Sequence, residues 1–142
     1  MTAITVISNK GQMSRLSEAK LSETNQRKLG QTGEHIARAW LEERGYTHVA
    51  ANIHTRQGEL DLIMQQNNIL VFVEVKLRRS RKQGHPLEAL TPRKKQHLLQ
   101  AARYYLLKHP HLGPIRFDAV GIETAGTENL RVTHIENAIQ CD

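Results

Sequence analysis

The chain has 142 residues, of which 39% are hydrophobic and 24% charged, the usual balance for one soluble globular domain. Twenty Lys and Arg against fourteen Asp and Glu give a net charge of +6, which draws a small domain toward polyanions such as nucleic acid, although a solubilising surface has the same composition. The single cysteine, Cys141, excludes an internal disulfide and a Cys-x-x-Cys zinc site. No stretch approaches the roughly 20 apolar residues of a membrane span, so we expect a cytoplasmic protein without a membrane partner.

The first part of the chain predicts a tail, a helix and three strands. Residues 1–28 are polar and lack sustained periodicity, which predicts a flexible N-terminal tail. A single domain is expected over residues 29–136, and it opens with GEHIARAWLEERG, whose apolar residues recur at helical spacing before Gly45. YTHVAANI, ELDLIMQ and ILVFVEVKL then predict three strands, the last of them apolar on both faces at its start, as in a central strand.

The second part predicts a second helix and further strands. A basic loop, RRSRKQGHP, leads to Thr91 and Pro92, an N-cap followed by proline at the first helical position. IRFDAVGI and LRVTHIE predict one or two more strands, and residues 137–142 are expected to form a C-terminal tail. The order helix, three strands, helix, one or two strands indicates an α/β domain with a mixed central sheet flanked by helices.

A hairpin within ELDLIMQQNNILVFVEVKL gathers the charged residues. With Asn67 and Asn68 as its turn, one face is wholly apolar, with the facing pairs Met64–Val71, Leu62–Val73 and Leu60–Val75. The opposite face carries the charges at the end away from the turn, as the facing pairs Asp61–Glu74 and Glu59–Lys76. A slip of one residue in one strand would put charges among the apolar side chains, whereas a slip of two would only stagger the pairs.

The facing carboxylates Asp61 and Glu74 repel each other unless a cation lies between them. Mg²⁺ suits such a place because it takes one or two carboxylates together with waters and phosphate oxygens. Lys76 lies on the same face, two residues beyond Glu74, where it would neutralise a phosphate. Alternatively, this is a solvated hairpin end in which Glu59 bonds Lys76 and Asp61 faces water. Glu34, at the edge of the first helix's apolar stripe, either caps that helix or points into the cleft.

Several motifs together resemble a known family. GEHIARAWLEERGY, N-I-H-T-R-Q-GELDLI, VFVEVKLRRS, AARYYL and RFDAVGI occur in the order found in the YraN family of small uncharacterised bacterial proteins, over about residues 29–123. That family is similar in turn to archaeal Holliday-junction resolvases and to the PD-(D/E)xK nuclease superfamily. The resemblance implies a restriction-endonuclease-like core that hydrolyses phosphodiesters with Mg²⁺ or Mn²⁺. Carried over by position, the implied catalytic residues are Glu34, Asp61, Glu74 and Lys76.

The implied reaction is in-line attack of a Mg²⁺-activated water on a phosphodiester. Asp61, Glu74 and the Val75 backbone carbonyl would hold the metal, and Glu34 would bind it through water or hold a second ion. Lys76 would orient the water or stabilise the charged transition state. Glu59 belongs to the family's own motif and is a candidate accessory residue. Leu60 stands where the superfamily label has proline, a mild departure because that proline carries no chemistry.

A basic surface continues from this site, formed by Arg78, Arg79, Arg81, Lys82, Arg93, Lys94 and Lys95. The last three oppose the dipole of the second helix, which favours a phosphate-binding surface over a solvated run of charge, the alternative interpretation. Aromatic residues are few, so duplex or branched DNA is expected rather than stacked single strands, although RNA stays open. By analogy alone, the resemblance suggests a homodimer. The competing functions are a nucleic-acid-binding module without turnover and a structural or assembly protein.

Overall fold

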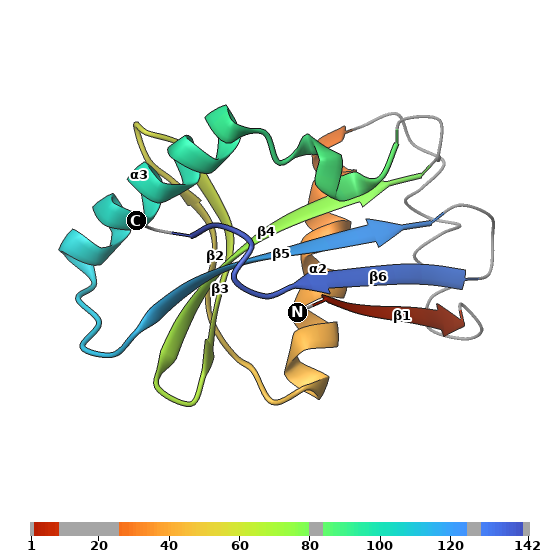
Figure 1. Ribbon diagram of the computed structural model, residues 1–142, viewed down its shortest axis with the longest axis horizontal. Helices are drawn as coiled ribbons and strands as arrows, with labels where there is room; N and C mark the ends of the chain where they lie inside the picture. The colour runs from red at the N-terminus through yellow and green to blue at the C-terminus, as the bar shows by residue number, and fades with distance from the viewer. Residues whose placement is uncertain (1, 9–25, 80–83, 125–128, 141–142) are drawn as a thin grey trace.

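The computed structural model describes residues 2–8, 26–79, 84–124 and 129–140 (Figure 1). In chain order its elements are β1 (Thr2–Ser8), α2 (Gln26–Glu43), β2 (Thr47–His54), β3 (Glu59–Gln66), β4 (Ile69–Arg78), the 3-10 helix η2 (Pro86–Ala89), α3 (Pro92–Lys108), β5 (Ile115–Glu123) and β6 (Asn129–Ile135). From α2 onward, the predicted order of helices and strands is confirmed. Within these ranges, neither α-helix combines the length and the apolar character that crossing a membrane would require.

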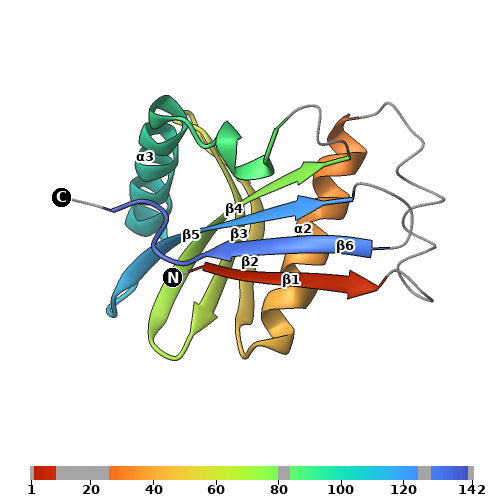
Figure 2. The ribbon, with the colours of Figure 1, turned by 45° about the vertical axis from the view of Figure 1, so that its right-hand side comes forward.

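The strands form one mixed sheet in the order β1-β6-β5-β4-β3-β2 (Figure 2). β4 and β5 are parallel, and the other neighbouring pairs are antiparallel. The parallel pair needs a crossover, and η2 with α3 supplies it. The predicted α/β class with a mixed sheet is therefore confirmed.

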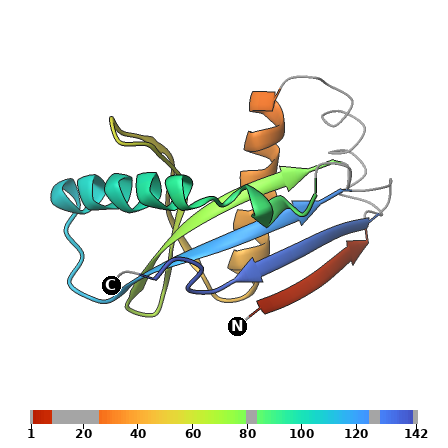
Figure 3. The ribbon, with the colours of Figure 1, turned by 45° about the horizontal axis from the view of Figure 1, so that its top comes forward.

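The two α-helices cover opposite faces of the sheet and bury two apolar clusters (Figure 3). Val71 and Val73 of β4 pack with the apolar stripe of α2, whereas Leu70 and Phe72 pack with α3. Successive side chains of a strand point to opposite faces, so β4 is covered on both sides. The sequence pattern of a central strand is confirmed.

The β3–β4 hairpin has the predicted turn and register over its first half. Asn67 adopts φ 54°, the left-handed conformation that asparagine tolerates well. The ladder confirms the pairs Met64–Val71 and Leu62–Val73, and the pairing of the two strands ends there. Farther from the turn, β3 stays paired with β2 and β4 stays paired with β5. The hairpin therefore opens into a fork, which is visible in Figure 1 as β2 and β3 bending away from β4.

The fork corrects the prediction for Leu60. This side chain packs in the cluster beneath α3, not on the face of Leu62 and Met64 as strict alternation predicts. On β2, Asn52 lies between Ala51 and Ile53, the partners of Leu62 and Leu60, and adopts φ 53°. A residue in the left-handed region interrupts the regular pleat, which accompanies the change of face.

The structure describes parts of both segments that were predicted as tails. Thr2–Ser8 form the edge strand β1, paired with β6 from Thr2–Ile135 to Ser8–Asn129, and α2 begins at Gln26; residues 9–25 lie outside the described part of the chain. At the other end, Ile139 is 6% exposed and packs beneath α3. The backbone N–H of Ala138 donates to the Phe117 carbonyl at 2.7 Å. Both terminal segments are attached to the domain through contacts with strands that are distant in the sequence.

Candidate acidic site at the sheet fork

Asp61 sits where β3 leaves β4. Its Oδ2 accepts a hydrogen bond from the backbone N–H of Val75 at 3.0 Å. The carboxylate thus takes the place of a ladder partner immediately beyond the last pair, Leu62–Val73. Asp61 therefore bonds to β4 at the point where the hairpin opens, and this places it beside Glu74.

Glu74 is a largely buried acid of the site. Its side chain is 11% exposed, and Oε2 lies 3.5 Å from the Nζ of Lys94, on the first turn of α3. Its Oε1 is buried and has no hydrogen-bond partner. Burial raises the pKa of Glu74 to about 8, helped by the charge of Asp61 and by a hydrogen bond to Asp61 that only the protonated acid can donate; Lys94 opposes the rise.

Glu34 approaches Asp61 from α2, on the other side of the fork. Burial raises the pKa of Glu34 to about 7, and the charge of Asp61 adds to the effect, whereas a hydrogen bond from the Asn52 side chain lowers it. Its Oε1 is also buried without a partner. Because α2 begins at Gln26, Glu34 lies well inside the helix, which excludes the alternative that it caps the helix N-terminus.

Glu59 and Lys76 do not form the facing pair that simple alternation predicts. Glu59 Oε1 lies 3.0 Å from His54 Nδ1, and both side chains are largely exposed. Lys76 is half-buried on β4, opposite Gly121 of β5, and shares the face of Glu74 by strand alternation. The ion pair between Glu59 and Lys76 that a solvated hairpin end predicts is not found among the described residues, and Asp61 accepts a hydrogen bond from the Val75 N–H.

Lys94 reaches Glu74 because α3 begins close to the fork. Thr91 is its N-cap, and the Thr91 Oγ1 accepts the Lys94 N–H at 3.2 Å. The β2–β3 turn packs against the next turn of α3, where a Cβ added to Gly58 would lie 3.3 Å from the His97 carbonyl oxygen. Lys94 was expected on a phosphate-binding surface, and the structure places it at the acidic site.

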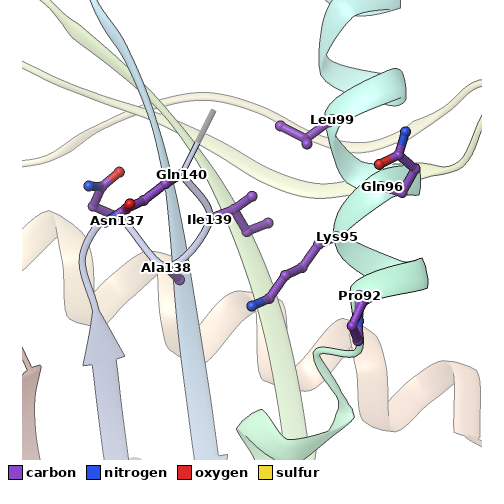
Figure 4. A pocket seen from close by; sticks show the side chains of 8 residues that line it. All are labelled: Pro92, Lys95, Gln96, Leu99, Asn137, Ala138, Ile139 and Gln140. Atoms are coloured by element: carbon purple, nitrogen blue, oxygen red, sulfur yellow. The ribbon is translucent and has the colours of Figure 1, made fainter. Parts of the chain in front are cut away.

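The remaining basic residues have mixed surroundings. Arg79 and Arg93 are exposed, Arg78 is half-buried, and Arg81 and Lys82 lie outside the described residues. Lys95 lines a cavity of about 440 Å³ between α3 and residues 137–140 (Figure 4). None of the acidic residues of the fork lines that cavity. The predicted basic surface is therefore divided between exposed cations, a cavity wall and the acidic site.

Sequence reasoning missed Asn52 and gave Lys94 a different role, on the phosphate-binding surface. Asn52 contributes the amide that contacts Glu34, and its only sequence signal is an asparagine inside a strand pattern, a residue that visits left-handed conformations. Lys94 contributes the counter-charge of Glu74, which lies 20 positions earlier in the sequence. Its signal was a lysine in the first turn of a helix, where a cation is disfavoured.

The donor set at the fork suits a hard cation. Within the described ranges, no group of three or more His, Cys, Asp or Glu side chains is arranged to hold a metal ion. The fork offers two neighbouring carboxylates, and the buried, partnerless oxygens of Glu34 and Glu74 are acceptors without a donor. Mg²⁺ commonly binds through one or two carboxylates and keeps several waters, so these residues fit it.

The family model and the similar proteins that match this chain all point to one family. A family model described as "Uncharacterised protein family UPF0102" matches residues 33–122, a span that contains the acids of the fork. A UPF0102 protein of Syntrophomonas wolfei is 45% identical over 113 residues, covering 79% of this chain and 97% of that protein. Another, of Bifidobacterium longum subsp. infantis, is 47% identical over 117 residues, covering 79% and 93%. A third, of Coxiella burnetii, is 39% identical over 117 residues, covering 81% and 94%.

Proposed function

Because the chain belongs to the uncharacterised protein family UPF0102, whose description states no activity, we propose its function from its own site. The protein is a metal-dependent, endonuclease-like enzyme that hydrolyses phosphodiester bonds in nucleic acid. One observation carries this proposal: Glu34, Asp61 and Glu74 come from three elements to one fork, and two of them keep buried, partnerless oxygens. Such an arrangement destabilises the protein unless a cation completes it, and perturbed acids of this kind are typical of functional sites.

Each residue of the fork has a chemical role in this proposal. Asp61, Glu74 and the Val75 backbone carbonyl would hold Mg²⁺ or Mn²⁺, which when bound would neutralise phosphate charge and acidify a water. Asp61 is fixed in position by its hydrogen bond from the Val75 N–H. Glu34 Oε1 would accept a hydrogen bond from the attacking water and orient it. Lys76, on the face of Glu74, would stabilise charge developing on the phosphate.

The substrate in this proposal is duplex or branched DNA. The net charge of +6 favours a polyanion, and Arg79 and Arg93 are exposed and able to contact phosphates. The described aromatic side chains with buried rings, such as Trp40 and Phe72, pack in the two core clusters, which leaves little for base stacking. Phosphate contacts position a substrate by its shape, which suits a branched structure.

Cleavage assays test the proposal directly. Labelled four-way junction, duplex and single-stranded DNA, with RNA counterparts, are incubated with Mg²⁺, Mn²⁺ or EDTA. We expect products that require the cation and disappear in Asp61→Asn. Glu43→Gln is the matched control, since Glu43 is an acid with a side chain 78% exposed, and its activity should equal that of the wild type. Products that persist in Asp61→Asn would refute the assignment of the site.

A nucleic-acid-binding module without turnover is the second candidate, and the Lys94–Glu74 ion pair favours it. That pair partly neutralises the site without any metal, as a site that has lost its cation would require. This candidate predicts salt-dependent binding to DNA that persists in EDTA, without products at any Mg²⁺ or Mn²⁺ concentration. Cation-dependent product formation would exclude it.

A further inference from the structure

The ion pair of Lys94 and Glu74 lies inside the proposed cation site. The ammonium is 3.5 Å from Glu74 Oε2, on the carboxylate that would bind the cation. The two partners differ in freedom, because the Lys94 side chain is 41% exposed whereas that of Glu74 is 11% exposed. Lys94 can therefore turn toward solvent while the carboxylate stays in place.

The position of Lys94 on its helix makes this pair informative. Its backbone N–H is held by the Thr91 N-cap, so Lys94 lies in the first turn of α3, where its charge opposes the helix dipole. The ionised Glu74 carboxylate offsets that cost when no metal is bound. A divalent cation beside Glu74 would remove the benefit, because two positive charges sharing one carboxylate repel each other.

We propose that Lys94 is the counter-ion of the acidic fork: its ammonium pairs with the ionised Glu74 carboxylate when no metal is bound, and a divalent cation displaces it toward the substrate phosphate. This role rests on the proposed function and extends it, because Lys94 then pairs first with Glu74 and afterwards with the substrate phosphate. Displacement frees the ammonium beside the bound metal, where a phosphodiester would lie. Binding of metal and binding of DNA therefore strengthen each other through Lys94.

Mn²⁺ binding measured by electron paramagnetic resonance tests the first half of the proposal. Lys94→Gln removes the competing ammonium, and we expect it to bind Mn²⁺ roughly three- to tenfold more tightly than the wild type. Lys94→Arg keeps the charge and should bind within about twofold of the wild type. Lys95→Gln is the matched control: it makes the same charge change on the neighbouring residue, which lines the cavity beside residues 137–140, and it should change affinity less than about twofold.

The second half is tested by the affinity for a fluorescent four-way DNA junction, measured by anisotropy with and without Ca²⁺. Ca²⁺ should raise the wild-type affinity at least threefold more than it raises that of Lys94→Gln. Urea unfolding shows whether each variant is folded, as expected for a side chain that is partly exposed.

The outcomes separate the two proposals. Tight Mn²⁺ binding by Lys94→Gln with weak or no binding by the wild type supports the counter-ion role. Wild-type binding that Lys94→Gln does not strengthen, or that Lys95→Gln strengthens equally, overturns that role and leaves the proposed function standing. Absence of binding in the wild type and in Lys94→Gln overturns both.

Discussion

Replacing Glu74 with glutamine is expected to stabilise the metal-free protein, although it removes a residue of the proposed active site. In the folded chain, burial and the neighbouring Asp61 raise the pKa of Glu74 from 4.5 to about 8. Each unit of difference between folded and unfolded states corresponds to about 1.4 kcal/mol. Keeping Glu74 ionised therefore costs on the order of 5 kcal/mol, which is large beside a typical domain stability of 5–15 kcal/mol.

The sign of this effect sets its pH dependence. Below pH 4.5 the carboxyl is protonated in both states and contributes nothing. Between pH 4.5 and about 8 the folded protein keeps a proton that the unfolded chain releases, so stability falls as pH rises. Above that window the loss is complete. Glutamine has no such titration, so the stability advantage of Glu74→Gln should be small at pH 5 and reach about 3 kcal/mol near pH 7.

Urea unfolding in EDTA at pH 5, 7 and 8.5 measures this difference. Glu43→Gln, at a largely exposed acid of α2, is the control and should show no comparable dependence on pH. Excess Mn²⁺ should stabilise the wild type and leave Glu74→Gln unchanged, because the variant lacks the ligand. An advantage of Glu74→Gln that stays constant from pH 5 to pH 8.5, or a variant less stable than the wild type at pH 8.5, would refute the reasoning.

Substitutions at three other residues have effects whose direction follows from the structure. Asp61→Asn keeps an oxygen acceptor for the Val75 N–H, so the protein should fold but lose its Mn²⁺-induced rise in Tm, as scanning fluorimetry would show; a retained rise would contradict the proposed ligand. Asn52→Gly preserves the left-handed φ of 53°, so it should slow cleavage while changing the free energy of unfolding by less than about 1 kcal/mol. Asn52→Val should lower the free energy of unfolding, measured in urea, by more than about 1 kcal/mol. Asp118→Asn leaves Arg116 without its carboxylate and should cost about 3–5 kcal/mol by the same method, a loss below about 1 kcal/mol being the contrary result.

The parts of the fold that follow from local chemistry could be predicted from the sequence. Thr91 with Pro92 marks the start of α3, because a hydroxyl acceptor and a fixed φ suit the first helical turn. Asn67 marks the hairpin turn, and alternation on both strands then determines the pairs around Leu62 and Val73. Each of these signals lies within a few residues of the feature that it determines.

The features that sequence could not supply depend on distant partners. β1 exists because Thr2–Ser8 find the free edge of β6, and nothing in the polar surroundings of that segment indicates a partner. Alternation determines the faces of a strand but not where its ladder ends, so it could not show that β3 leaves β4 beyond Leu62. For the same reason the pairing of Lys94 with Glu74 was hidden, since it requires α3 to dock beside the fork.

Asp118 and the acids of the fork differ in how their negative charge is balanced. Asp118 is fully buried, yet its pKa is lowered, because hydrogen bonds from His134, from Arg116 and from the Asn137 N–H outweigh the cost of burial. Its oxygens all have donors, and the cluster ties β5, β6 and the C-terminal segment together.

At the fork the balance is reversed: the pKa of Glu74 is raised, its Oε1 lacks a donor, and the single ion pair comes from a lysine that can turn away. The same chain supplies hydrogen-bond donors to both oxygens of Asp118. Folding alone therefore does not explain why Glu34 and Glu74 each have a buried oxygen without a donor. The shortfall of donors at the fork therefore supports the proposed cation and substrate.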